Sequence, residues 1–322
     1  MNGVLRTKYW IESWLLFVSL ALGVVIFCWF RVWIVGELDT AQFRQIIDLL
    51  PKDWRKFSPV NFDWLVSYLG RTSLTLDEPM LIMLVTGWSM IRGSDVVAGE
   101  LSRGTMEMLL SQPVTRRQVF ISHACWTIVL LAALTTLTWI GMTIGIWTTS
   151  VTETTYPTLN VLVWGLQIPL RFLPPHVETI PMSDMVNPWS FWPGILNLFC
   201  LGVFFGGLSA CCSAHDRYRW RTLGFVIGFY FANAGLKLLG MASEKWAWVT
   251  NCSVFGFYSP AAAIERTDAD PNSLWQVLRW DTEGHFAGAG SLTNGVLLMV
   301  LGLLLYVWGC RVFERRDLPA PV

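Results

Sequence analysis

Long apolar runs separated by short polar connections make up most of this sequence. A helix of roughly 17 to 25 apolar residues spans the hydrocarbon core of a bilayer, which is about 30 Å thick. Five runs meet this length, and a sixth is weaker because its apolar stretch, PMLIMLVTGWSMI, is short and leads into Arg92 and Asp95. The pattern predicts an all-α integral membrane protein with six transmembrane helices, at residues 11–35, 75–97, 119–147, 192–212, 222–239 and 292–312.

Composition agrees with a chain that has lipid as its solvent. Hydrophobic residues make up 53% of the 322 positions and charged residues only 14%, whereas charged residues are about a quarter of a soluble domain. The first span is longer than a signal-peptide core and no small-x-small cleavage site follows it, so we expect it to remain as a helix. The seven cysteines form no CxxC pair, and we expect neither a disulfide framework nor a metal cluster.

Charge predicts the orientation of the six spans, which put both termini on one side. If that side is cytoplasmic, the inner segments hold 12 basic and 7 acidic residues, which leaves 11 of the 23 basic and 16 of the 23 acidic residues outside. Basic residues in short cytoplasmic loops are typical of membrane proteins. We therefore expect both termini to be cytoplasmic, in a multi-pass protein of the bacterial plasma or inner membrane.

The three outer segments, 36–74, 148–191 and 240–291, are too short and too polar for independent domains. The whole chain, 1–322, is therefore expected to be one transmembrane domain. Residues 43–50 (FRQIIDLL) have an amphipathic pattern. Residues 160–173 and 255–266 are too short to span, and we expect them to lie in the membrane interface or to re-enter the bilayer.

Glycines four residues apart recur inside the spans. Such pairs lie on one helix face and allow neighbouring backbones to approach closely. The pairs are Gly141 with Gly145, Gly202 with Gly206, and Gly224 with Gly228. They are consistent either with packing inside one chain or with dimerisation.

A polar stretch, DVVAGELSRGTMEMLLSQPVTRRQ (95–118), separates the second and third spans. Gly99 and Gly104 permit a sharp departure from the second span, and Pro113 ends helical runs. A short amphipathic helix is expected between them, with Arg103 and Glu107 four residues apart on its polar flank. Its apolar stripe consists of Leu101, Met106, Leu109 and Leu110.

The ends of this stretch carry further charges. Arg116 and Arg117 are expected to hold the start of the third span at the inner surface. Arg92 and Asp95 either pair inside the bundle, three residues apart, or mark its inner mouth. A short amphipathic element on the basic side of the membrane either lies on the membrane or is held by a partner.

The stretch AGELSRGTMEMLLSQPVTRRQVFISH resembles the signature that follows the second span in ABC exporter permeases of the type 2 class. In that pattern a Gly-Glu pair, a basic residue, Gly-Thr, an acidic residue, a Leu-rich turn, Ser-x-Pro-Val and a basic pair follow in order. The C-terminal FERRDLP (313–319) resembles the tail of many such permeases, particularly the branch associated with maturation of copper enzymes.

The resemblance implies the permease subunit of an ATP-driven exporter, which couples ATP hydrolysis by a separate ATPase subunit to movement of a substrate. The implied partners are that ATPase and a second copy of the permease or a related permease, around a pathway between the two. The polar stretch would be the coupling helix. Its implied contacts with the ATPase are Glu100, Leu101, Arg103, Gly104, Thr105, Met106, Glu107, Leu109, Leu110 and Arg117.

The residues independently indicate that this chain hydrolyses no nucleotide. A P-loop needs a lysine followed by Ser or Thr, to hold the phosphates and magnesium. None of the lysines is followed by either: they are Lys8, Lys52, Lys56, Lys237 and Lys245. We therefore expect no cofactor and no catalytic residue in this chain, with ATP and magnesium bound by the partner.

Other functions remain as alternatives. The chain could be a non-transporting scaffold that recruits a cytosolic ATPase through the same stretch, or, more remotely, a membrane-embedded enzyme. Asp281, Glu283 and His285 in DTEGH could bind a metal or simply be solvated. RYRWRT (217–222) mixes basic and aromatic residues, but we expect it to anchor the inner surface and not to bind nucleic acid.

Overall fold

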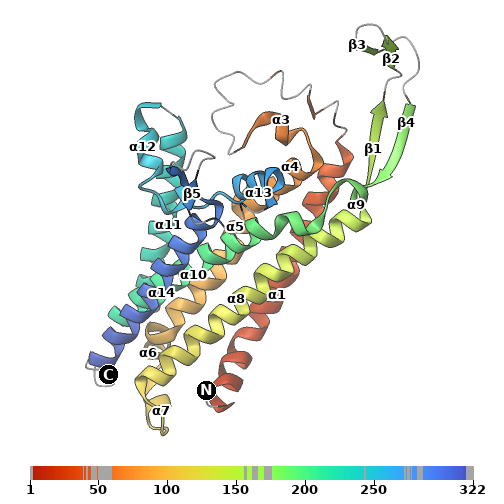
Figure 1. The fold of residues 1–322 in the computed structure, drawn as a ribbon. Coiled ribbons are helices and arrows are strands. Elements are labelled where there is room, and N and C mark those ends of the chain that lie inside the picture. Colours follow the sequence, from red (N-terminus) through yellow and green to blue (C-terminus); the bar gives the residue numbers. More distant parts are fainter. Residues whose placement is uncertain are drawn as a thin grey trace.

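Six long helices form the body of the molecule (Figure 1). The computed structural model describes residues 3–38, 40, 43, 44, 49, 60–155, 158–161, 166–169, 176–242, 244–271, 273, 276, 278–280 and 286–316. The long helices are α1 (Gly3–Glu37), α5 (Pro79–Ser94), α8 (Arg116–Thr148), α10 (Trp192–His215), α11 (Arg219–Ala242) and α14 (Ser291–Arg315). All six are long and apolar enough to cross a membrane, which confirms the predicted all-α membrane fold.

The second span differs from the predicted limits at both ends. Residues 74–77 form a separate 3₁₀ turn, and Glu78 is extended before Pro79 opens α5. Proline suits this first helical position because its missing N–H has no partner there. At the other end the helix continues through a π-helical stretch, η3 (Asp95–Gly99), and a last turn, α6 (Glu100–Ser102). The span therefore covers Pro79–Ser102 and not 75–97.

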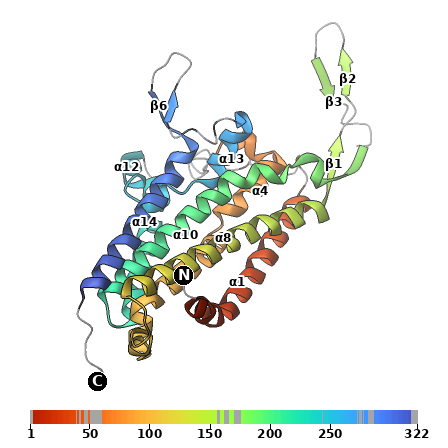
Figure 2. The same ribbon diagram turned by 60° about the horizontal axis from the view of Figure 1, so that its bottom comes forward.

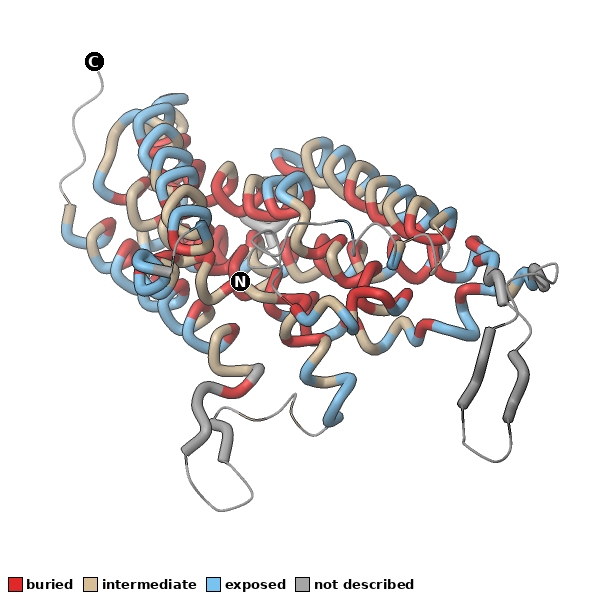
Figure 3. The backbone as a smooth tube through the Cα atoms, turned by 90° about the horizontal axis from the view of Figure 1, so that it is seen from above, coloured by how far each residue is buried: buried red, intermediate tan, exposed pale blue. Residues whose placement is uncertain are grey.

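Helix α10 is the centre of the bundle. It packs against α5, α8, α11 and α14, while α1 lies against α8. In the spans of α5 and α10, 72% of the residues in an apolar stretch of 18 are buried, against 17% in the span of α1 and 22% in that of α11. Figure 3 shows buried residues on inward faces and exposed residues around the periphery. The peripheral helices therefore leave large apolar surfaces for lipid or another chain.

Glycine spacing explains several close contacts. A methyl group at Gly207 would overlap the backbone of Gly302, so α10 and α14 cross closely only because both positions lack a side chain. The predicted glycine pairs divide into two kinds. Gly141 and Gly145 pack against α1, and Gly202 and Gly206 pack against α8 and α14. Gly224 and Gly228 of α11 face open space.

Short helices gather at the end of the bundle away from α6 (Figure 1). They are α3 (Phe62–Leu65), α4 (Tyr68–Ser73), η2 (Leu74–Asp77), α9 (Met182–Met185), η4 (Pro188–Phe191), η5 (Glu244–Trp246), α12 (Ala247–Thr250), η6 (Val254–Gly256) and α13 (Pro260–Ala269). Residues 255–266, predicted to lie in the interface or re-enter, fall in η6 and α13, and the start of α13 is buried. Of residues 43–50, only 43, 44 and 49 are among the described residues.

Among the described residues, three antiparallel strand pairs extend this same end, and the sequence did not predict them. The pairs are β1 (Ser150–Thr155) with β4 (His176–Pro181), β2 (Thr158–Val161) with β3 (Leu166–Pro169), and β5 (Leu278–Trp280) with β6 (Phe286–Ala289). The described parts of 160–173 are thus strands, and their interfacial or re-entrant position stays a prediction. The run SVTETT is rich in β-branched residues, which favour strands.

The remaining short helix, α7 (Met106–Leu110), lies at the opposite end of the bundle together with both chain ends (Figures 1 and 2). We call this the terminal end. It carries the polar stretch that the sequence singled out.

Candidate coupling site

The chain from residue 95 to residue 115, called the 95–115 segment, begins as an unbroken continuation of α5. It leaves the helix at Gly104, whose φ of +71° is a left-handed conformation that glycine adopts without steric cost. Gly99 lies inside the helical stretch η3. The predicted departure at Gly99 is therefore wrong, and the predicted single helix is two pieces, α6 and α7.

The π-helical stretch depends on Ser213 of the neighbouring helix α10. Its hydroxyl accepts the backbone N–H groups of Val97 and Ala98 at 3.2 and 2.8 Å and donates to the Ser94 carbonyl at 2.9 Å. A π turn disturbs the regular helical hydrogen bonds, and such turns often occur at functional sites. The contact with Ser213 ties the end of the second span to the central helix.

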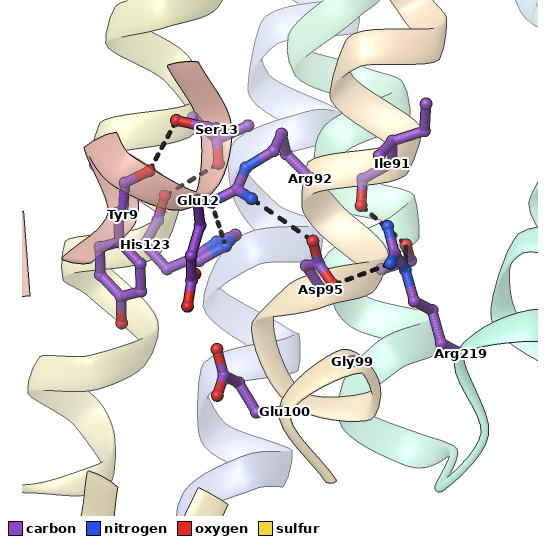
Figure 4. Close-up of polar contacts among 12 residues, drawn as sticks. Tyr9, Glu12, Ser13, Ile91, Arg92, Asp95, Gly99, Glu100, His123 and Arg219 are labelled. Carbon is purple, nitrogen blue, oxygen red and sulfur yellow. Dashed lines mark hydrogen bonds and ion pairs between the residues drawn. The ribbon is translucent and has the colours of Figure 1, made fainter. Parts of the chain in front are cut away.

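Asp95 is the first of two carboxylates that organise the terminal end. It is buried and pairs with three guanidinium groups, those of Arg92 at 3.4 Å, Arg103 at 2.9 Å and Arg219 at 3.3 Å. Figure 4 shows Arg92 and Arg219 approaching Asp95 from two sides. Arg219 belongs to α11, so one carboxylate joins two spans. Of the two alternatives for Arg92 and Asp95, the structure confirms pairing inside the bundle.

The network continues from Arg92 to α8 and α1. Arg92 Nη2 lies 3.1 Å from His123 Nε2 of α8, and the Tyr9 ring of α1 packs edge-on against the His123 ring. Tyr9 Oη donates to the Val119 carbonyl at 3.3 Å. Arg92 and His123 are each 3% exposed, so these contacts lie in a low-dielectric interior where an unpaired charge is costly.

Glu100 is the second carboxylate, and it joins the 95–115 segment to α1. Its Oε1 pairs with Lys8 Nζ at 2.7 Å and with Arg103 Nη2 at 3.2 Å. Thr105 donates its hydroxyl to Oε2. Glu100 is 2% exposed. The resemblance implied that Glu100 contacts an ATPase, whereas in this structure its side chain is used inside the chain.

Arg103 links the two carboxylates from the surface. Burial lowers the pKa of its guanidinium, but Asp95 and Glu100 outweigh burial and raise the pKa above its usual value. Arg103 is therefore always charged. Its expected partner Glu107 is exposed instead, because the turn at Gly104 separates α6 from α7.

The apolar residues of the segment face two ways. Met106 is fully buried, and Leu109 packs beside Tyr9, Val114 and Trp126. These two residues hold α7 against the bundle and are not available to a partner in this conformation. Leu101 and Leu110 are partly buried against the main core.

Met108 is the large apolar residue that α7 presents outward. It is 71% exposed, and the residues near it in sequence that are also exposed are mostly polar: Ser102, Arg103, Gly104, Glu107, Ser111 and Gln112. The predicted apolar stripe omitted Met108. An exposed apolar residue inside a polar rim is typical of a binding surface. We call Met108 and these neighbours the exposed tip.

A reciprocal cap fixes the far end of the segment. Thr115 Oγ1 accepts the N–H of Gln118 at 3.2 Å, and the Gln118 side chain accepts the N–H of Thr115 at 3.0 Å. This capping box satisfies two free donors at the start of α8. Arg117 lies between these two residues, exposed, with Nε 3.9 Å from a Glu314 oxygen. The predicted site residues thus fall into a buried group and an exposed group, both in or next to the 95–115 segment.

Comparison with known families shows the family to which the chain belongs. A family model described as "ABC-2 family transporter protein" matches residues 8–173, about half of the sequence. The chain belongs to the ABC-2 transporter family. Among curated proteins no relative was found. As an ABC-2 membrane component the chain is a permease of several spans, a class that works with an ABC ATPase.

The region that matches the ABC-2 model includes most of the charged network. Lys8, Asp95 and Glu100 lie within residues 8–173, as does the whole 95–115 segment, whereas Ser213 and Arg219 do not. The predicted link to the copper-enzyme branch stays a prediction. Residues 317–319 of FERRDLP, and Asp281, Glu283 and His285, lie outside the described residues. Among the described residues no group of three His, Cys, Asp or Glu could hold a metal ion.

Proposed function

We propose that this ABC-2 permease is the membrane subunit of an ATP-driven exporter and that the 95–115 segment receives movement from a separate ATPase subunit. The observation that carries the proposal is the network around Asp95 and Glu100. It joins the segment directly to α1 through Lys8 and to α11 through Arg219. A displacement of the segment would therefore be passed to several spans at once.

Charge supports a cytoplasmic position for the terminal end. The segments assigned to that end carry the excess of basic residues, in short connections, which is the usual bias of cytoplasmic loops. The ATPase would then meet the exposed tip from the cytoplasm, in a bacterial plasma or inner membrane. ATP and magnesium would be bound by that partner.

A second permease copy, or a related permease, would complete the transport unit. The unpartnered glycines Gly224 and Gly228 and the low burial of α11 support a protein neighbour on that helix. The substrate pathway would lie between the two chains.

Contact with the ATPase would center on Met108. Coupling requires contacts that differ between the two ATPase states. We expect Met108, as an apolar anchor in a polar rim, to make one of these contacts. Met108→Asp should weaken ATPase association at least about tenfold, as expected for loss of an interface hot spot. The matched control is Met185→Asp, because Met185 is an exposed methionine at the other end of the bundle.

The test is affinity purification of the tagged permease from native membranes, followed by vanadate-sensitive ATP hydrolysis. We expect an ATPase with wild type and with Met185→Asp, and its loss with Met108→Asp. Equal recovery with both variants contradicts docking at the exposed tip. An ATPase that copurifies while inverted vesicles show no ATP-dependent loss of native cargo would favour the scaffold alternative.

A further inference from the structure

We propose that the groove between α8 and α14 at the terminal end binds an anionic phospholipid from the leaflet that faces the ATPase. The groove has a volume of about 550 Å³. The inference relies on the proposed orientation of the terminal end, but it does not depend on ATPase docking at the exposed tip.

The groove has the shape that a lipid requires. Its walls run from Arg117 to Ile128 along α8 and back from Glu314 to Leu303 along α14. Eleven residues of helix rise about 17 Å, which is close to the depth of one leaflet, about 15 Å. The long dimension therefore suits one acyl chain that starts at the membrane surface.

The lining changes from charged to apolar along this length. Arg117, Arg311 and Glu314 stand at the mouth, and Ile121, Cys125 and Val307 line the interior. Two guanidinium groups against one carboxylate give the mouth a net positive charge. That order matches a phosphate head group above a hydrocarbon chain.

Arg311 is the residue that selects an anion. Among the described residues it has no ion-pair or hydrogen-bond partner, and it is exposed. Arg117 holds Glu314 only loosely, at 3.9 Å. A phosphate would therefore gain charged donors without breaking a strong contact.

Two other grooves lack this combination. The groove between α8 and α10, of about 400 Å³, has a wholly uncharged lining that includes Thr135, Trp192 and Phe199. The groove at α10 and α11 contains Arg221, but this residue already pairs with Asp216 at 3.6 Å. The free basic mouth thus distinguishes the α8–α14 groove.

Native mass spectrometry of the purified permease tests the proposal, with phosphatidylglycerol and phosphatidylcholine of identical acyl chains as probes. We expect tighter retention of phosphatidylglycerol. Arg311→Gln should weaken it about fivefold, as expected for loss of one basic residue at a membrane surface, and should leave phosphatidylcholine unchanged. Arg315→Gln is the matched control, because it removes the same charge from the same helix outside the groove lining.

A second variant tests the apolar part. Cys125→Trp should fill the groove and reduce retention of both lipids, while size-exclusion profiles confirm that each variant is folded. Equal retention of the two lipids by wild type would overturn the proposal, as would equal losses in Arg311→Gln and Arg315→Gln. Since these measurements need no ATPase, failure here leaves the proposed coupling role intact, and failure of ATPase docking leaves the lipid site intact.

Discussion

Helix α5 is held in different ways at its two ends. At the terminal end, the buried carboxylates of Asp95 and Glu100 pair with basic groups from several elements, those of Lys8, Arg92 and Arg219. At the opposite end, Tyr258 Oη donates to the Leu76 carbonyl at 2.5 Å, and Lys237 Nζ donates to the Tyr258 carbonyl at 3.1 Å. The ion pair of Arg31 with Glu78 there is partly exposed.

The difference shows where the helix can transmit movement. Breaking a buried ion pair leaves an uncompensated charge and costs several kcal/mol, whereas exposed pairs contribute little. The terminal end therefore resists separation of the spans it joins. Among the described contacts, the opposite end has hydrogen bonds to backbone carbonyls, a partly exposed ion pair and the electrostatic attraction of Asp77 and Lys237. No carboxylate there is paired with several basic groups among the described residues, as Asp95 is.

Asp95→Ala should have the largest effect on stability. It leaves the buried Arg92 without its carboxylate and should cost about 3–5 kcal/mol. The measurement is the apparent thermal midpoint of the protein in detergent. The double variant Arg92→Met/Asp95→Leu should recover most of the loss, because apolar residues replace a buried pair at little cost. A double variant no more stable than Asp95→Ala would show that the charges are not the cause.

Lys8→Met should have the next largest effect. Glu100 loses its closest cation, and a hydrogen bond to a charged group contributes about 1.5–3 kcal/mol. Glu12→Gln is the control, because its contact with Lys8 at 3.4 Å is much more exposed and should contribute less than about 1 kcal/mol. Similar midpoints for the two variants would contradict a latch between α1 and the 95–115 segment.

Tyr258→Phe tests the opposite end. Loss of the bond to Leu76 leaves a buried carbonyl without that donor and should cost about 1–2 kcal/mol. ATPase association should be unchanged, since Tyr258 is far from the exposed tip along α5. Reduced association with normal folding would show that the two ends are not independent.

Asp77→Asn should show its effect in the pH dependence of stability. Burial raises the pKa of the Asp77 carboxyl from 3.8 to about 6, against the opposing charge of Lys237. The folded state therefore binds the proton more tightly than the unfolded state. The resulting stability is present below pH 3.8 and is lost as pH rises to about 6. The thermal midpoint of wild type should fall relative to Asp77→Asn over this range, and a constant difference would contradict the assignment.

The sequence predicts the spans well because their signal is local. Length and apolar content are sufficient to define a transmembrane helix, and each of the six predicted spans overlaps a long apolar helix, with the largest differences at the start of the first span and at both ends of the second. The start of the second span depends on the extended backbone at Glu78 before Pro79. The strand pairs lie in the connections between spans, and apolar length, the signal that predicts the spans, does not reveal their β-branched residues as strands.

The site was predicted in position but not in detail. The residue pattern located the polar stretch, and spacing offered the pairing of Arg92 with Asp95 as one of two alternatives, which the structure decides. Spacing could not show that Glu100 meets Lys8, because that partner lies 92 residues away in the sequence. Nor could the apolar stripe show that Met106 packs into the bundle, which leaves Met108, outside the stripe, as the apolar residue of α7 that faces outward.

Site-specific photocrosslinking in native membranes tests the central claim most directly. A benzophenone amino acid would replace Met108 in one sample and Met185, at the opposite end of the bundle, in another. We expect an ultraviolet-dependent crosslink from position 108 to a protein that contains a P-loop, and none from position 185. No such crosslink from position 108 in a folded permease, or equal crosslinks from both positions, would contradict the claim that the exposed tip receives an ATPase.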